Sequence, residues 1–239
     1  HRDLHSFPTR RSSDLVIILF IVFYTMVLCA QWSSDPGVNL PITNLTGEQV
    51  TPKIAVCPDG SYYIGYFSLE AGNYNVRLQR LDKKGNKLWQ ENGLLVSNHP
   101  SMTWITDWDM TTDLESHAVL CFMDIRNSGN NNIVAYRISP EGDFVWGADG
   151  IMLSNDDNFN AAPKLTVTNS NNMVFAWQST NNIVIQKLNP QGQKQWGEWG
   201  ITFTGTVKYT WPQLLPVGDD DVIMKYFNDS GTKIGRAHV

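Results

Sequence analysis

The segment Leu188–Thr204, LNPQGQKQWGEWGITFT, decides the fold because two earlier segments repeat it. They are Leu81–Ser97, LDKKGNKLWQENGLLVS, and Ile138–Ser154, ISPEGDFVWGADGIMLS, and the three copies begin 57 and then 50 residues apart. Each copy has a glycine, a tryptophan four residues later and a second glycine four residues after that. These motif residues are Gly85, Trp89, Gly93, Gly142, Trp146, Gly150, Gly192, Trp196 and Gly200.

Three short runs rich in β-branched and aromatic residues precede each copy, which predicts strands. In the last complete copy they are Pro163–Val167, Asn172–Gln178 and Asn181–Leu188. Four short strands in a repeat of about 50 residues are typical of a β-propeller blade. We therefore predict an all-β, β-propeller-like fold with about three complete four-stranded blades and part of a fourth, truncated. The expected blades are residues 51–97, 98–154, 155–204 and 205–233, after a lead-in at 31–50.

The motif residues have structural roles in this prediction. The first glycine ends a turn between the third and fourth strands, where it is free to adopt positive φ. The tryptophans supply large buried area where one blade packs on the next.

Both ends of the chain have an unusual origin. Residues 1–15 and 234–239 can be back-translated into a short-read sequencing adapter and its reverse complement. We therefore predict that both segments are adapter-derived and non-native, and we exclude them from the functional argument. Removing them takes away four arginines and two aspartates, so the net charge changes from −5 to −7. A mildly acidic chain with scattered charge argues against nucleic-acid binding.

An uncharged apolar run, Val16–Ala30, precedes the polar residues 31–35. Its length fits the apolar region of a signal peptide and is shorter than a membrane span. We expect cleavage after Ala30, no membrane span in the mature chain, and a secreted or cell-surface location; an uncleaved anchor helix is the alternative. Beyond this run only Cys57 and Cys121 remain, and we expect them to be small buried residues and not a disulfide.

The chain resembles the secreted β-propeller repeat proteins of environmental bacteria, often exported by the type IX route. The resemblance rests on the opening Trp32–Ile42, the step Gln49-x-x-Pro52-Lys53-Ile54 and the G-x-x-x-W-x-x-x-G blade ending. It covers nearly all of residues 31–233 and implies a fold more than a function. The blade ending is also similar to the Asp-box of sialidases and to the Trp-docking motif of quinoprotein dehydrogenases, but its spacing departs from both.

Catalysis needs residues that break the repeat, and few are available. The weak candidate polar site consists of Asp107, Asp109, Asp124 and Arg126, with Glu115 nearby. Paired carboxylates could serve glycoside hydrolysis if they converge at the right separation. We expect Asp124 and Arg126 to lie at a strand end beside Asn127-Ser-Gly129, a solvated turn, and Asp219–Asp221 to form a hairpin turn instead of a calcium loop.

These observations favour a non-catalytic binding or scaffold module, with an unidentified glycan or protein ligand at the cell surface. The alternative is part of a sialidase-like propeller glycoside hydrolase whose catalytic residues lie partly in further blades. We expect no cofactor, no metal site and no catalytic residue in this segment. Three blades and part of a fourth are too few for a usual propeller closure, which predicts an exposed edge strand.

Overall fold

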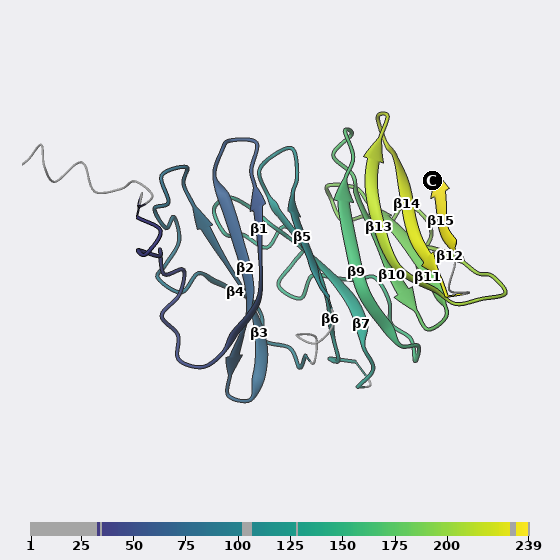
Figure 1. Cartoon of the computed structure of the whole chain (residues 1–239), viewed down its shortest axis with the longest axis horizontal. Helices are drawn as coiled ribbons and strands as arrows, with labels where there is room; N and C mark the ends of the chain where they lie inside the picture. The colour runs from purple at the N-terminus through teal and green to yellow at the C-terminus, as the bar shows by residue number, and fades with distance from the viewer. Residues whose placement is uncertain (1–32, 34, 102–106, 128, 230–232, 239) are drawn as a thin grey trace, which may run out of the picture. The chain divides into compact units, whose positions relative to one another are not determined.

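The computed structural model describes residues 33, 35–101, 107–127, 129–229 and 233–238, and these residues form antiparallel sheets (Figure 1). Three sheets have four strands each, and their order in space follows the chain. The prediction of three four-stranded blades and part of a fourth is therefore confirmed. The first sheet contains β1 (Gln49–Val56), β2 (Tyr62–Glu70), β3 (Asn73–Leu81) and β4 (Leu94–Ser97).

The next two sheets repeat this arrangement, and the last has three strands. The second contains β5 (Asp109–Thr112), β6 (Ala118–Asp124), β7 (Asn132–Ile138) and β8 (Ile151–Met152). The third contains β9 (Asn160–Val167), β10 (Met173–Ser179), β11 (Asn182–Leu188) and β12 (Ile201–Phe203). The last contains β13 (Tyr209–Val217), β14 (Asp221–Asn228) and β15 (Lys233–His238).

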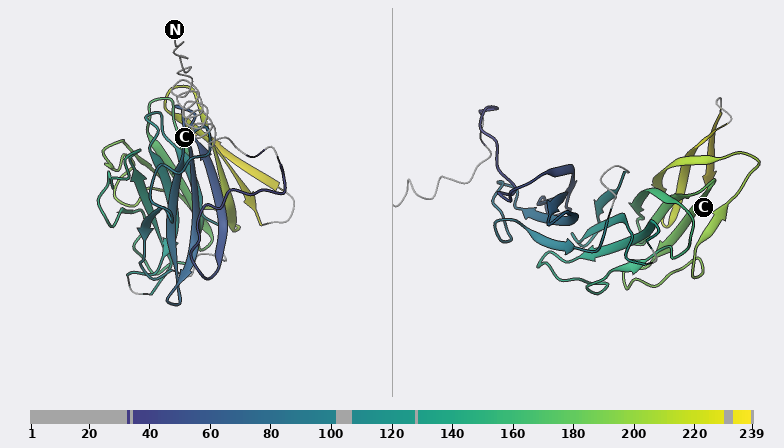
Figure 2. Two further views of the ribbon diagram at one scale, coloured as in Figure 1. Left: turned by 90° about the vertical axis from the view of Figure 1, so that its left-hand side faces the viewer. Right: turned by 90° about the horizontal axis from the view of Figure 1, so that it is seen from below.

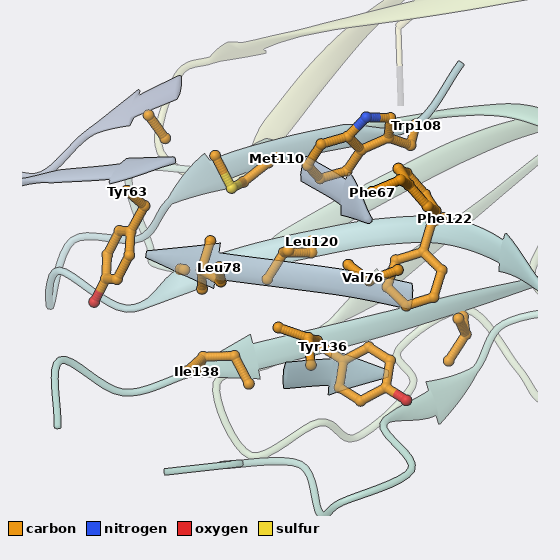
Figure 3. Close-up of a cluster of buried hydrophobic side chains, with 14 of the residues drawn as sticks. Tyr63, Phe67, Val76, Leu78, Trp108, Met110, Leu120, Phe122, Tyr136 and Ile138 are labelled. Carbon is orange, nitrogen blue, oxygen red and sulfur yellow. The ribbon is translucent and has the colours of Figure 1, made fainter. Parts of the chain in front are cut away.

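Each sheet packs against the next through its own apolar core. One buried cluster joins the first and second sheets, a second joins the second and third, and a third joins the third and last. Figure 3 shows the first cluster, in which Phe67, Trp108 and Phe122 contact edge to face. The first strands β1, β5, β9 and β13 are consecutive neighbours, so we call them the inner strands (Figures 1 and 2).

The motif tryptophans lie at the contact between one blade and the next. The Trp89 indole N–H donates to the Pro140 carbonyl at 3.2 Å, and the Trp146 indole N–H donates to the Pro190 carbonyl at 3.1 Å. Each proline belongs to the turn of the following blade, and a guanidinium from the third strand donates to the same carbonyl. Arg80 contacts Pro140 and Arg137 contacts Pro190, both at 3.1 Å. We call this pair of donors the interblade latch.

The second glycine of each motif has no room for a side chain. A Cβ at Gly93, Gly150 or Gly200 would lie 2.4–2.5 Å from a carbonyl oxygen of the third strand. Each of these glycines also has positive φ, between 65° and 80°. The close approach of two backbones therefore requires glycine at this position.

The last strand, β15, pairs with β14 from Ile223↔His238 to Asn228↔Lys233. Most of β15 falls within the segment 234–239 that we predict to be adapter-derived. Strand pairing uses backbone groups that every residue carries, so an open edge accepts a segment of almost any sequence. The apolar run 16–30 lies outside the described residues. Among the residues that are described, no helix has the length and hydropathy to cross a membrane.

Candidate functional site

The inner strands of three blades share a backbone distortion at the residue just before a proline. Thr51, Ala162 and Trp211 all have positive φ, of 48°, 48° and 53°, and the strand register shifts there. Each precedes a proline, and the residue after that proline resumes the regular pairing. The residues that resume it are Lys53, Lys164 and Gln213, opposite Gly65, Ala176 and Lys225.

In the second blade, Asp107-Trp108-Asp109 stands in place of this three-residue proline step. Asp109 pairs with Cys121, so it occupies the position of Lys53 and Lys164 in the neighbouring blades. The Trp108 side chain is fully buried, and its indole N–H donates to the Thr51 carbonyl at 2.8 Å. The absence of a side chain at Gly65 makes room for this ring, since a Cβ there would lie 2.6 Å from it. Trp108 thus anchors the two aspartates that flank it.

Four charged side chains from three blades meet here, three of them on inner strands and Asp107 just before β5. We call them the inner-strand cluster: Lys53, Asp107, Asp109 and Lys164. Lys53 Nζ lies 3.2 Å from Asp107 Oδ1 and 4.0 Å from Asp109 Oδ1. Lys164 Nζ contacts Asp107 Oδ2, and the Leu165 backbone N–H donates to Asp109 Oδ2 at 3.0 Å. Equivalent strand positions bring these residues together, although they are far apart in the sequence.

Burial changes the proton affinity of two of these groups. Desolvation raises the pKa of the Asp109 carboxyl, although the Leu165 N–H and the Lys53 ammonium oppose this. Desolvation, and then the nearby Lys53 charge, lower the pKa of Lys164 to about 8. The cluster therefore holds a carboxyl and an ammonium that titrate closer to neutrality than usual, a property that is enriched at functional sites.

An exposed aromatic residue lies on the next inner strand. Trp211 is 54% exposed and belongs to β13, which neighbours β9. It stands at the position that Thr51 and Ala162 occupy in other blades. Trp211 therefore presents an exposed aromatic ring on the inner strand next to the one that carries Lys164, and ligand sites commonly combine aromatic and charged groups.

Asp124 and Arg126 do not belong to this cluster, because they lie at the far end of β6. Arg126 Nε donates to Asp124 Oδ2 at 2.6 Å, Arg126 Nη2 donates to the Tyr136 hydroxyl at 3.0 Å, and Arg126 Nη1 donates to the Asp149 carbonyl at 2.7 Å. Asp124 is the last residue of β6, at the strand end where it was expected, and it is buried, whereas Asn127 in the neighbouring turn is exposed. The pair braces the loop before β8, because it links that loop to β6 and β7.

A second group, Asp113, Glu115 and His117, has a spacing that could hold a metal ion. The Arg137 guanidinium already lies among these side chains. Its Nη2 is 2.5 Å from Asp113, 2.7 Å from Glu115 and 3.2 Å from His117 Nδ1. The guanidinium therefore supplies the positive charge that a metal ion bound by these three side chains would supply. It serves the interblade latch at the same time.

Asp219 and Asp220 lie in the turn between β13 and β14. Asp220 Oδ1 accepts hydrogen bonds from Thr168 Oγ1 at 2.8 Å and from Asn172 Nδ2 at 2.9 Å, and Lys187 pairs with its other oxygen. These bonds connect the last sheet to the third blade. Cys57 and Cys121 are both buried and unbridged, as expected.

Reasoning from sequence identified Asp107 and Asp109 but missed Lys53, Lys164 and Trp211. The signal was the recurring proline step, which reads Thr-Pro-Lys, Ala-Pro-Lys and Trp-Pro-Gln in three blades. Alignment of these steps with Asp107-Trp108-Asp109 would have placed Lys53 and Lys164 level with Asp109, and Trp211 level with Asp107.

No family model matches the chain, and no curated protein matches it. Solved structures do resemble it. An α-L-arabinanase of Penicillium chrysogenum is 15% identical over 83% of this chain and 65% of its own length, with a TM-score of 0.49. An endo-arabinase of Bacteroides thetaiotaomicron is 14% identical over 79% and 73%, with a TM-score of 0.37. Both TM-scores are below 0.5 and both identities are below 25%, so no function of this chain follows from the likeness.

Proposed function

We propose that this propeller binds a glycan across its inner strands, at the inner-strand cluster. The observation that carries the proposal is the meeting of Lys53, Asp107, Asp109 and Lys164 from three different blades. Repetition alone would give each blade the same residue at the strand position of Lys53, Asp109 and Lys164. The row instead alternates between lysine and aspartate, and the second blade carries a buried tryptophan that holds both aspartates in place.

The chemistry of the cluster fits a polyhydroxylated ligand. Carboxylates accept hydrogen bonds and ammonium groups donate them, and sugar hydroxyls do both. The exposed Trp211 ring offers an apolar face of the kind on which a sugar ring packs. The two charges of each sign balance one another, so the cluster favours hydroxyl recognition over the binding of a strongly charged ligand.

Glycoside hydrolysis is the second candidate, and one observation favours it. Asp109 has a pKa raised by burial, whereas Asp107 is more exposed and contacts two ammonium groups. Two carboxyl groups with different environments are the arrangement from which a general acid and a base or nucleophile are made. In this candidate Asp109 is the acid and Asp107 acts as the ionised partner.

The test is a glycan array followed by calorimetry and a hydrolysis assay on the same glycans. We expect Asp107→Asn and Trp211→Ala each to weaken glycan binding roughly tenfold, which corresponds to about 1.4 kcal/mol. Gln49→Ala, on the inner strand β1 but outside the cluster, is the matched control and should bind normally. Turnover that disappears in Asp109→Asn would establish the hydrolase; glycan binding unaffected by the cluster variants would refute the site.

We also propose that the protein acts outside the cytoplasm. The support is the apolar run Val16–Ala30, followed at once by polar residues. Fractionation of cells that express the natural gene, with an antibody against the blades, would test this. Recovery of a shortened chain in the medium or at the cell surface is the expected result, and retention in the cytoplasm would contradict it.

A further inference from the structure

The third blade contains a cavity of about 130 Å³ that lies away from the inner strands. It is bordered by the end of β10, the start of β11, the outer strand β12 and the loop that follows β8. The residues that matter for the argument are Ser154, Asp156, Trp177, Ser179, Val184 and Trp199. The cavity is mixed in character, with two indole rings, a carboxylate and several hydroxyl or amide groups.

An arginine occupies the corresponding place in the first blade. Arg77 on β3 is held by Glu70, with Nε and Nη2 donating to the two carboxylate oxygens at 2.6 and 2.8 Å. Its Nη1 reaches the carbonyl oxygen of Asn92 at 3.5 Å. Asn92 directly precedes the second motif glycine, so the guanidinium lies beneath the turn into the outer strand.

The second blade places an arginine there as well, from a different position in the chain. Arg126 follows β6, pairs with Asp124 and donates from Nη1 to the Asp149 carbonyl at 2.7 Å. Asp149 precedes its own motif glycine, as Asn92 does. Two blades thus satisfy the same carbonyl position with a guanidinium, although the arginines come from different strands.

The third blade has no arginine at either position. The strand register places Val184 where the first blade has Arg77, because Leu78 pairs with Leu94 as Ile185 pairs with Ile201. It also places Ser179 where the second blade has Asp124, counted from the equivalent Cys121 and Ala176, and the short turn that follows, Thr180-Asn181, contains no arginine. The cavity therefore lies in the space that a guanidinium takes in the other two blades.

The cavity lining suits a cation. Asp156 contributes a carboxylate whose Oδ1 accepts the Asn158 backbone N–H at 3.0 Å and Asn160 Nδ2 at 2.8 Å, which fixes its orientation. Trp199, 51% exposed, replaces Asn92 and Asp149 before the motif glycine. The Lys194 ammonium lies 4.7 Å from the centre of the Trp199 ring, so this ring already accepts a cation on its surface.

We propose that this cavity is a binding site for a guanidinium group carried by a ligand, such as an arginine-type side chain. The ligand takes the place that Arg77 and Arg126 take in the other blades, with Asp156 as its counter-charge and Trp199 as its aromatic wall. This site is separate from the inner-strand cluster, and it does not depend on the glycan proposal.

Calorimetry on the purified protein with two matched probes tests the proposal. N-acetyl-arginine amide carries the guanidinium, and N-acetyl-citrulline amide has nearly the same shape without the charge. We expect the arginine probe to bind with a millimolar Kd, and the citrulline probe to bind at least roughly tenfold more weakly, since charge-assisted hydrogen bonds and cation–π contacts are lost. Equal binding of both probes, or no binding of either up to about 50 mM, a free energy weaker than about −2 kcal/mol, would overturn the proposal.

Two variants show where the probe binds. Val184→Arg places a guanidinium at the position of Arg77, and Asn181→Glu adds a carboxylate in the adjacent turn as its partner. The double variant fills the cavity, so it should abolish binding of the arginine probe. Asn181→Glu alone is the matched control and should keep binding. Should the double variant fail to fold, Trp199→Leu on the exposed ring should still weaken binding severalfold. Binding that survives both the filled cavity and Trp199→Leu places the site elsewhere and overturns the proposal.

Discussion

At the turns between blades, Trp89 and Trp146 occupy equivalent positions and donate the same hydrogen bond to Pro140 and Pro190. On the inner strands, equivalent positions carry Lys53, Asp109 and Lys164, which differ in charge and contact one another or a shared partner. The turns must match because each blade docks on a copy of itself. The inner strands are free to differ, since their side chains meet near solvent, and this is where a ligand can be recognised.

The largest expected effect is at a glycine of the repeated turn. Gly150→Ala would place a Cβ 2.5 Å from the Ala135 carbonyl oxygen and 3.0 Å from the Tyr136 ring, so the backbone must shift. We expect it to lower the free energy of unfolding by about 3 kcal/mol or more. Chemical denaturation measures this directly.

Gly147→Ala is the matched control for this substitution. Gly147 also has positive φ, but no atom lies within 4 Å of its would-be Cβ. Gly147→Ala should therefore lower the free energy of unfolding only by the backbone strain, about 1–2 kcal/mol. Equal losses in the two variants would show that backbone conformation, and not the close approach to the third strand, selects glycine at Gly150.

The next effect concerns the interblade latch. Trp146→Leu removes a large half-buried ring and its bond to the Pro190 carbonyl, and we expect it to cost about 2–4 kcal/mol. Trp196 is the comparison, because its indole N–H donates to no carbonyl among the described residues, while Lys187 lies over its ring. The loss of unfolding free energy in Trp196→Leu should therefore be smaller than in Trp146→Leu by about 1 kcal/mol, the usual contribution of one hydrogen bond. Thermal and denaturant melts of both variants would show the difference, and equal losses would mean that packing alone explains the motif tryptophan.

The smallest effect is a pH dependence at the inner strands. The pKa of Lys164 is lowered from 10.5 to about 8 in the folded chain, so the unfolded chain binds more protons between these values. The wild type should therefore gain stability relative to Lys164→Arg as the pH rises from about 8 to 10, by about 1–2 kcal/mol. Arginine stays protonated throughout, so the variant serves as its own reference for all other groups. A stability difference that stays constant with pH would show that Lys164 is not desolvated.

The inner-strand cluster shows how far pattern reading reaches. Asp107 and Asp109 stand out because they interrupt a proline step, and this departure is visible in the sequence. Lys53 and Lys164 look like ordinary strand lysines, since each is 50 or more residues from the aspartate it contacts. Only the packing of β1, β5 and β9 side by side makes them one cluster.

Asp124 and Arg126 show a contact that no local pattern predicts. Their place beside the Asn127-Ser-Gly129 stretch suggested solvent, because turn formers usually lie at the surface. The structure buries Asp124 because Arg126 folds back over it toward Tyr136 and the Asp149 carbonyl. Such a contact joins three segments of the second blade, and no local pattern records it.

The sequence by itself determined the blade: the spacing of Gly, Trp and Gly fixes a turn, a packing ring and a close backbone approach, and these are local requirements that recur with each copy. The tertiary structure alone decided which unlike residues meet. The inner-strand cluster depends on neighbouring strands from different blades, and the cavity of the third blade depends on the absence of an arginine that two other blades supply from different positions. Both arise from contacts between segments distant along the chain, where side-chain volume and charge are matched in space and leave no periodic signal.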